Sequence, residues 1–509
     1  MSLAKSYCAQ LIGLSSEIII VEVDISNGLH AFSVVGLGDR SVEEAKDRIA
    51  AAIKNSGYVS PKQKNQKVVI SLAPADLRKE GPSFDLAMAL AYLAASGDIE
   101  LEAEHKLFLG ELSLEGRVRR VSGLLPILCQ AAAQGFTQAF IPKDNQEEAS
   151  LARGLDLYPV SSLGEVIDHL TNRRQIAPLV PRQPSAPAKK SDYALDMSAI
   201  RGNESSKRGL EIAAAGAHNI LMFGPPGTGK TMLAQSFSSI LPPLSYEQSV
   251  EVTSIHSAAR ILGNILITEP PFRAPHHTAS YPSIVGGGNF PKPGEISLAH
   301  RGVLFLDEFP EFDHGVIEAL RQPLEDRFIT ISRARGTVTF PAQCILIASM
   351  NPCPCGKGRD HGCTCTNQAL EAYKRKLSSP IIDRLDIWLN IHKIDYDKLA
   401  ALTSDGEGSE MIRRRVVAAR RIQSQRYGSF GIHKQYNSEM SAPDIEKCIV
   451  LSDEARDLLR ASAKKLELSG RGFHRVMKVA RTIADLAGCQ TVQKDHVLEA
   501  LQYRQKITG

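Results

Sequence analysis

The stretch NILMFGPPGTGKT, residues 219–231, carries the strongest structural signal in the chain. It opens with an apolar run that predicts a buried strand, and an apolar helical pattern follows it. Between them lies the spacing G-x-x-x-x-G-K-T, in which glycines let backbone N–H groups converge on phosphate oxygens at the start of a helix. The stretch therefore predicts a parallel-sheet α/β domain that binds a nucleoside triphosphate.

Each part of this loop has an expected role in binding ATP and Mg²⁺. Lys230 reaches the terminal phosphates, and the Thr231 hydroxyl ligates the metal. A chance glycine loop is the alternative, which the strand, loop and helix context disfavours. The expected nucleotide-binding residues are Gly224, Pro225, Pro226, Gly227, Thr228, Gly229, Lys230, Thr231 and Asp307.

Two further apolar runs end in polar side chains. GVLFLDE, residues 302–308, ends in Asp307 and Glu308, and the run at residues 344–350 is followed by Asn351. Parallel sheets bind ligands at the carboxyl ends of their strands. We therefore expect Asp307 to hold Mg²⁺, Glu308 to polarise the attacking water, and Asn351 to orient that water.

Length and composition set wide bounds on the protein. With 509 residues, 43% apolar and 23% charged, the chain is expected to form roughly three globular domains. The net charge of +4 requires any nucleic-acid surface to be local. The sequence has neither an apolar run of about 18 residues nor a signal-peptide pattern, so we expect a cytoplasmic protein without a membrane segment.

Prolines at three-residue spacing mark a domain boundary; they are Pro178, Pro181, Pro184 and Pro187. Residues 173–193 are therefore expected to form an extended linker. Before it, residues 1–172 mix β-rich runs with alanine-rich helical stretches, which predicts an α+β domain. After it we expect an ATPase core at 194–395 and a helical domain at 396–509. In the latter, an arginine-rich helix at 413–426 predicts a solvated face rather than a DNA contact.

The sequence resembles a known family at several motifs. GPPGTGKT, VLFLDE, ASMNPC and IIDRLD are similar to motifs of the magnesium-chelatase-like clade of AAA+ ATPases. RAPHHTAS (273–280), GEISLAHRG (294–302) and RQPLED (321–326) narrow the resemblance to the bacterial ComM/YifB group of competence-associated ATPases. It covers essentially the whole chain, and it implies a hexameric ring with ATP at the subunit interfaces.

The resemblance also implies roles for three side chains. Asn351 matches the first sensor of nucleotide state. Arg384 matches the arginine finger that stabilises charge on a neighbouring subunit's nucleotide, although its position alone predicts an ion pair with Asp383 or Asp386. Arg471 matches the second sensor, with Arg475 as the alternative. The implied function is a DNA motor for helicase activity or branch migration in natural transformation and homologous recombination.

A basic hairpin is the expected DNA contact. Alternating β-branched runs at 328–332 and 337–340 flank Arg333 and Arg335, which predicts a hairpin with two arginines at its tip. Such a tip suits phosphate contacts, and a solvated turn is the alternative. In related AAA+ clades a hairpin before the first sensor projects into the central pore.

Four cysteines close to one another predict a metal site; they are Cys353, Cys355, Cys363 and Cys365. Four thiolates suit one tetrahedral Zn²⁺. Free thiols or redox chemistry are the alternative. Because the cluster starts two residues after Asn351, bound zinc would anchor the end of that strand, a structural role.

The N-terminal domain resembles Lon-type proteases without their catalytic pair. PADLRKEGPSFDL, residues 74–86, places Ser83 at the nucleophile position, and GELSLEGRV, residues 110–118, continues the similarity. Leu125 stands where the partner lysine is expected, so the serine lacks its base. The resemblance implies a Lon-like, ribosomal S5 domain 2-like fold that acts as a scaffold or DNA platform. A metal-chelatase motor subunit and an ATP-dependent protein remodeller remain the alternative functions.

Overall fold

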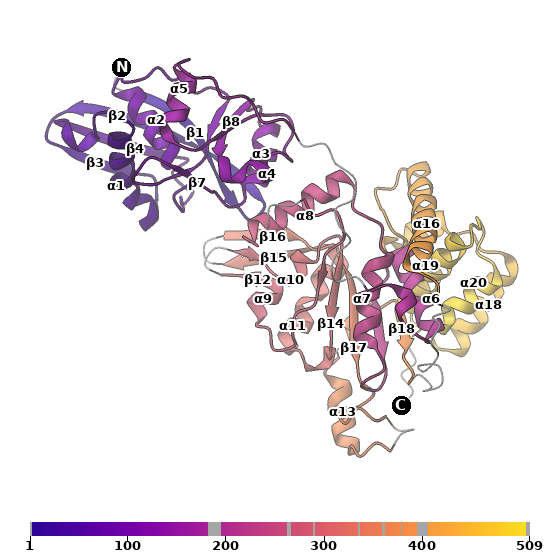
Figure 1. Cartoon of the computed structure of the whole chain (residues 1–509). Coiled ribbons are helices and arrows are strands. Elements are labelled where there is room, and N and C mark those ends of the chain that lie inside the picture. The colour runs from indigo at the N-terminus through magenta and orange to yellow at the C-terminus, as the bar shows by residue number, and fades with distance from the viewer. Residues whose placement is uncertain are drawn as a thin grey trace. The chain divides into compact units, whose positions relative to one another are not determined.

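The computed structural model describes residues 3–181, 195–261, 266–288, 291–333, 336–358, 362–377, 379–393 and 406–504. The chain divides into two compact units (Figure 1). The N-terminal unit comprises Met1–Ala186 and Ser249–Ile267, and the C-terminal unit comprises Pro187–Gln248 and Thr268–Gly509. This organisation, with a parallel sheet in the C-terminal unit, agrees with the expected multidomain α/β class.

The N-terminal unit contains a mixed sheet and a smaller parallel sheet. In the mixed sheet, ordered β1-β2-β4-β3, β3 and β4 run parallel and the other neighbours antiparallel. Its strands are β1 (Leu3–Ile12), β2 (Ser15–Asn27), β3 (Ala31–Val35) and β4 (Gln66–Ala73). The parallel sheet consists of β5 (Lys106–Phe108), β8 (Gln138–Pro142) and β9 (Asp156–Val160). A short ladder pairs β6 (Glu111–Leu112) with β7 (Val118–Arg119).

Helix α2 lies in the core of this unit. Its sequence DLAMALAYLAA is apolar on every side after Asp85, and a helix without a polar face must be buried. The Asp85 carboxylate accepts hydrogen bonds from Arg48 Nε at 2.8 Å and from the Leu112 N–H at 3.2 Å. The helices of the unit are α1 (Arg40–Asn55), α2 (Asp85–Ala95), α3 (Leu124–Ala133), α4 (Gln146–Ala149) and α5 (Leu163–Leu170).

Two segments outside the expected first domain complete its core. Most of helix α8 (Tyr246–Ala258) belongs to the N-terminal unit, where Val250 and Leu266 pack against the apolar cluster. Ile176 and Leu179, from the expected linker, pack there too, and the Leu179 N–H donates to the Leu157 carbonyl at 2.7 Å. The rest of that linker, residues 182–193, lies outside the described residues.

The C-terminal unit is built on a parallel sheet ordered β11-β14-β17-β10-β18. Its strands are β10 (Ile220–Phe223), β11 (Phe272–Arg273), β14 (Val303–Leu306), β17 (Ile345–Met350) and β18 (Ile387–Asn390). The central strands β14 and β17 are buried along their whole length, which explains why they read as continuous apolar runs.

Helices and two small ladders surround this sheet. The helices that precede β18 are α6 (Glu204–Gly216), α7 (Lys230–Ile240), α9 (Tyr281–Val285), α10 (Glu295–Leu298), α11 (His314–Ala319), α12 (Arg321–Asp326), α13 (Asn367–Arg375) and α14 (Ser379–Ile382). A short ladder pairs β12 (Gly286–Gly287) with β13 (Lys292–Pro293). The expected basic hairpin is confirmed as β15 (Phe328–Arg333) and β16 (Gly336–Pro341), which are antiparallel. Arg335, at its tip, lies outside the described residues.

The chain after β18 is helical, as expected, and shares one apolar core with the sheet. Its helices are α16 (Ser409–Ser429), α17 (Ala442–Cys448), α18 (Asp453–Lys465), α19 (Gly470–Leu486) and α20 (Lys494–Gln502). Val416 and Ala419 of α16 are buried in this core. Arg414 and Arg421 of α16 are exposed, as expected of a solvated face, but other arginines of this helix contact the core. Arg413, for example, donates from Nη2 to the Ser239 carbonyl at 2.7 Å.

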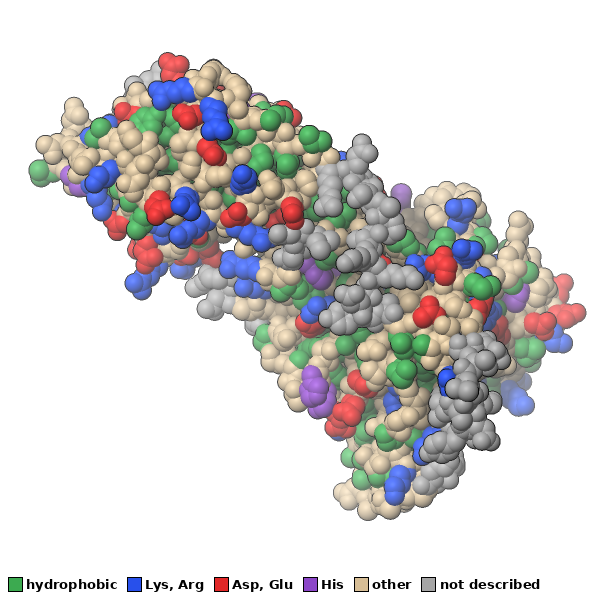
Figure 2. All heavy atoms as spheres, viewed as in Figure 1, with side chains coloured by type: hydrophobic (Ala, Val, Ile, Leu, Met, Phe, Trp, Pro, Cys, Tyr) green, Lys and Arg blue, Asp and Glu red, His purple; other side chains and the backbone are tan. Residues whose placement is uncertain are grey.

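Basic and acidic side chains are interspersed on the face shown in Figure 2, in keeping with the small net charge. None of the helices in the described ranges has the length and apolar character that a bilayer-spanning segment requires.

Candidate nucleotide-binding site

The three polar ends expected from the sequence meet at one edge of the sheet. Strands β14, β17 and β10 are parallel neighbours, so their carboxyl ends lie side by side. Asp307 follows β14, Asn351 follows β17, and the phosphate loop follows β10. The loop, the paired carboxylates and the amide therefore face the same space, as a site that binds and hydrolyses a nucleotide requires.

The glycines of the loop are required by its backbone. A Cβ atom at Gly224 would lie 2.3 Å from the Ile391 carbonyl oxygen, so only glycine fits there. Gly229, immediately before α7, has φ +86°, in the left-handed region that glycine adopts without strain. Because α7 begins at Lys230, the loop ends at a helix amino terminus, where free N–H groups favour phosphate.

Lys230 points back into the loop. Its Nζ donates to the carbonyl oxygens of Gly224 at 2.8 Å and Pro225 at 2.9 Å, and to Asn351 Oδ1 at 3.1 Å. Burial lowers the pKa of Lys230, and the nearby Asp307 and Glu308 oppose that shift. The contact with Asn351 joins the end of β17 to the phosphate loop.

Asp307 is held in one orientation by three donors. Thr231 Oγ1 donates to its Oδ2 at 2.9 Å, while Ser349 Oγ and the Glu308 N–H, the latter at 3.0 Å, donate to Oδ1. A carboxylate beside a hydroxyl offers the hard oxygen ligands that Mg²⁺ prefers, so these residues fit that metal. The sequence did not identify Ser349, which reads as one residue of a buried strand.

Glu308 has a different environment from its neighbour. Its side chain is 53% exposed, and its backbone is left-handed at φ +51° and ψ +44°. Its Oε2 lies 3.3 Å from His277 Nδ1. This conformation is uncommon for a residue other than glycine. Residue patterns alone do not indicate a role for His277, although it lies in RAPHHTAS, a segment that carries the family resemblance.

Arg384 is not paired with either expected aspartate. Its guanidinium forms an ion pair with Glu325 of α12 and donates to the Pro380 carbonyl. The side chain is 10% exposed. The aspartates proposed from the sequence, Asp383 and Asp386, lie beside arginines of α19 instead. The ion pair expected from sequence proximity is wrong, because Glu325 of α12, which is distant in sequence, lies closer to the Arg384 guanidinium.

The two candidates for the second sensor lie one turn apart on α19. Arg471 is 66% exposed, with Nη1 4.0 Å from Asp383 Oδ2. Arg475 is 11% exposed and lies between the two aspartates, with Nη2 3.7 Å from Asp383 Oδ1 and Nε 3.8 Å from Asp386 Oδ1. Arg475 is therefore held by the chain itself, whereas Arg471 is largely exposed to solvent.

The four predicted cysteines come together after Asn351. All four sulfur atoms lie within 4.8 Å of one another. Cys353 Sγ is 3.2 Å from Cys355 Sγ and 3.5 Å from Cys363 Sγ. Sulfur ligands of one tetrahedral Zn²⁺, each about 2.3 Å from the metal, lie about 3.8 Å apart, so this donor set fits zinc.

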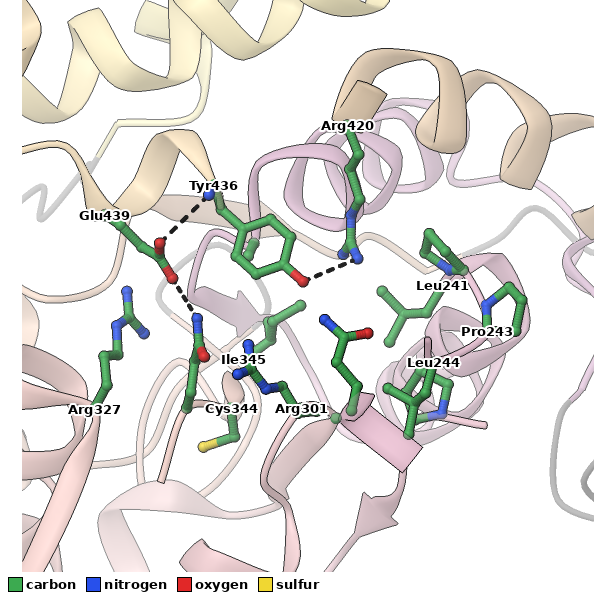
Figure 3. A pocket seen from close by; sticks show the side chains of 16 residues that line it. Leu241, Pro243, Leu244, Arg301, Arg327, Cys344, Ile345, Arg420, Tyr436 and Glu439 are labelled. Carbon is green, nitrogen blue, oxygen red and sulfur yellow. Dashed lines mark hydrogen bonds between the residues drawn. The ribbon is translucent and has the colours of Figure 1, made fainter. Parts of the chain in front are cut away.

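A separate cavity lies at the opposite edge of the sheet (Figure 3). Its lining includes Arg301 and Cys344, which precede β14 and β17, together with Arg420 and Tyr436 from the helical region. The Arg420 guanidinium lies 4.6 Å from the centroid of the Tyr436 ring and donates from Nη2 to the Ala214 carbonyl at 2.7 Å. The cavity therefore lies between the helical region and the sheet, and the Arg420 side chain in its wall is already bonded to the protein.

Comparison with known proteins places the whole chain in one family. Residues 196–399 match the family described as magnesium chelatase, subunit ChlI. Residues 21–145 match subunit ChlI of Mg-chelatase, and residues 406–504 match the C-terminal family of the same subunit.

Individual relatives agree with these matches. The competence protein ComM of Haemophilus influenzae is 40% identical over 513 residues, which covers 100% of this chain and 98% of that protein. The uncharacterized protein YifB of Escherichia coli is 39% identical over 507 residues, covering 99% of this chain and 97% of that protein. A Lon protease of Brevibacillus choshinensis is 29% identical over 165 residues, covering 31% of this chain and 21% of that protein. The chain therefore belongs to the ComM/YifB group of magnesium-chelatase-like proteins.

Proposed function

We propose that this protein is an ATPase that forms a hexameric ring and drives movement along DNA, as a helicase or branch-migration motor in natural transformation and homologous recombination. One observation carries the ATPase part, the convergence of Lys230, Thr231, Asp307, Glu308 and Asn351 at one sheet edge. The DNA part is supported by the full-length likeness to a competence protein and by the basic hairpin.

The geometry supports a division of labour in hydrolysis. Lys230 would exchange its loop carbonyls for the terminal phosphate oxygens, and Thr231 and Asp307 would hold Mg²⁺. Bound Mg²⁺ neutralises charge on the phosphates. Glu308, exposed and next to this edge, would accept a proton from the attacking water, while Asn351 Oδ1 stays near Lys230 and orients that water.

Assembly into a ring would complete the site. We propose that Arg384 of one subunit stabilises the transition state of a neighbour's nucleotide, which requires it to exchange Glu325 for phosphate. Arg471, exposed at the start of α19, would contact the nucleotide within its own subunit as the second sensor.

The N-terminal unit is proposed to be a Lon-like scaffold without peptidase activity. The similarity to a Lon protease supports the fold. Leu125 is fully buried in α3, and its backbone N–H donates to Glu148 Oε1 at 3.0 Å. An apolar side chain there supplies no base to activate Ser83.

The cysteine cluster is proposed to bind one structural Zn²⁺, and the short sulfur separations support it. Metal analysis of the purified protein tests this directly. The expected result is one zinc per chain, and its absence under reducing conditions would leave the free-thiol alternative.

A metal-chelatase motor subunit is the second candidate, favoured by the family descriptions of all three matched segments. One experiment separates the candidates: the ATPase rate is measured with single-stranded DNA, with branched DNA, with a porphyrin-chelatase partner, or with unfolded protein. We expect DNA to stimulate hydrolysis and branched DNA to be unwound. Stimulation by the chelatase partner alone would establish the second candidate, and stimulation by unfolded protein alone would establish a protein remodeller.

The hairpin contact with DNA has its own test. Replacing Arg333 and Arg335 by Ala removes two cationic side chains and is expected to weaken DNA binding and its salt dependence, with basal ATPase activity retained. DNA affinity measured at several salt concentrations checks this. Unchanged affinity and unwinding would remove the hairpin from the DNA-binding site.

A further inference from the structure

The four-cysteine cluster lies directly against the phosphate loop. Gly356, in the turn between Cys355 and Cys363, faces Pro226 of the loop. A Cβ atom at Gly356 would lie 2.9 Å from both Cγ and Cδ of Pro226. This approach is closer than a side chain tolerates, so the turn and the loop are packed without a gap.

The turn that carries Gly356 is hydrogen-bonded to Cys353. The Gly356 N–H donates to the Cys353 carbonyl at 2.9 Å, and the Gly358 N–H donates to Cys353 Sγ at 3.3 Å. Both bonds end on Cys353, one on its carbonyl oxygen and one on its sulfur. A metal ion that held the Cys353 sulfur would therefore also help to hold the turn that contacts Pro226.

A second path connects the cluster to Asn351. Helix α13 begins two residues after Cys365, and its buried Tyr373 donates from the hydroxyl to the Asn351 carbonyl at 3.2 Å. The chain therefore leaves the sheet at Asn351, passes through the cysteines and returns to the same residue. The Asn351 side chain accepts a hydrogen bond from Lys230 Nζ, so the cysteine segment is connected through Asn351 to the lysine of the phosphate loop.

We propose that the cysteine cluster is a metal-dependent brace of the nucleotide site, in which bound zinc holds the Gly356 turn against Pro226 and holds Asn351 against Lys230. This inference rests on the proposed zinc site. Metal occupancy then sets nucleotide affinity, and linkage requires that nucleotide binding strengthens zinc binding by the same factor.

The first experiment removes the metal from the full-length protein. Zinc content is measured, the protein is dialysed against the chelator TPEN, and the affinity for the fluorescent nucleotide mant-ADP with Mg²⁺ is compared before and after zinc is restored. We expect affinity to fall on the order of tenfold without zinc and to recover on its return, a typical size for coupling between two sites. Reversible zinc removal with unchanged affinity would overturn the brace and leave the zinc site intact, whereas a protein that binds no zinc would overturn both.

The second experiment leaves every thiol in place. Gly356→Ala pushes a methyl group into Pro226, whereas Gly362→Ala is a matched control, because Gly362 has a similar φ of +75° against +78° and nothing within 4 Å of its Cβ position. Both variants are expected to keep one zinc. Only Gly356→Ala is expected to weaken mant-ADP binding several-fold, and equal affinities for the two variants would contradict the contact with the phosphate loop.

The reciprocal effect provides a readout independent of catalysis. Release of zinc to the chelator is timed with and without ATPγS and Mg²⁺. We expect bound nucleotide to slow release in the wild-type protein and to have less effect in Gly356→Ala. If nucleotide does not change the rate of zinc release from the wild-type protein, the two sites are not coupled and the proposal is wrong.

Discussion

Asp307 and Glu308 are neighbours in the sequence, yet their surroundings give them different chemistry. Asp307 accepts hydrogen bonds from Thr231 and Ser349, which hold its carboxylate in one orientation. Glu308 is half-exposed, has a left-handed backbone and lies beside His277. A fixed carboxylate suits a metal ligand, and an exposed one suits proton transfer with water.

Replacing Glu308 by Gln tests this division. Gln keeps the size of the side chain but cannot accept a proton, so nucleotide binding should be retained while turnover falls by about 10²-fold or more. Binding of mant-ADP and the rate of phosphate release measure the two effects separately. Normal turnover would remove Glu308 from its proposed role.

His277 is expected to position the Glu308 carboxylate. In His277→Ala the contact at 3.3 Å is lost and the carboxylate is free to rotate, so we expect turnover to fall about tenfold with little change in nucleotide affinity. The matched control is His276→Ala, because the His276 ring packs at a tilt on His277, with the ring centroids 4.2 Å apart, and its Nδ1 forms a hydrogen bond with Thr278 Oγ1. Equal losses in the two variants would indicate a packing role instead.

At the scale of elements, α16 shows how a charged helix can be structural. Arg413 donates to the Ser239 carbonyl near the end of α7, and Arg420 donates to the Ala214 carbonyl near the end of α6. Cations are favoured at the carboxyl ends of helices, where carbonyl groups lack intrahelical partners. These arginines therefore attach α16 to α6 and α7.

Arg420→Ala is expected to destabilise the C-terminal unit by about 2–3 kcal/mol, because it removes charged hydrogen bonds and leaves the Ala214 carbonyl without this donor. Arg421→Ala on the same helix is the control, since Arg421 is exposed. Urea unfolding of both variants measures the difference. Equal midpoints would show that the Arg420 contacts contribute nothing measurable.

Across the full chain, neither of the two compact units is a single continuous stretch of sequence. Residues 249–267 follow the phosphate loop and α7, yet they belong to the N-terminal unit, where Val250 and Leu266 pack on its core. The Ser257 hydroxyl also donates to the buried Glu148 carboxylate. A division of the chain at the proline-rich segment would thus separate the N-terminal core from part of its own structure.

A fragment containing residues 1–181 is therefore expected to be less stable than the same unit in the full chain. Without α8 it exposes apolar surface that is covered in the intact protein, so it should bind the dye ANS and unfold at a lower temperature. A synthetic peptide of residues 246–267 added to the fragment should reverse both effects. A fragment as stable as the intact unit would show that α8 contributes little to its core.

Local sequence patterns predict the polar edge of the parallel sheet, the basic hairpin as a secondary structure and the four-cysteine cluster, and the structure contains all three. These features are local: a glycine loop must follow its strand, parallel strands must align their carboxyl ends, and neighbouring cysteines cannot lie far apart. Other features become visible only in the folded chain: the Glu308–His277 and Arg384–Glu325 pairs, the structural contacts of Arg413 and Arg420, and the place of α8 in the N-terminal unit. Each of these depends on contacts between segments distant in sequence, and residue type and spacing do not specify which distant surface a side chain will meet.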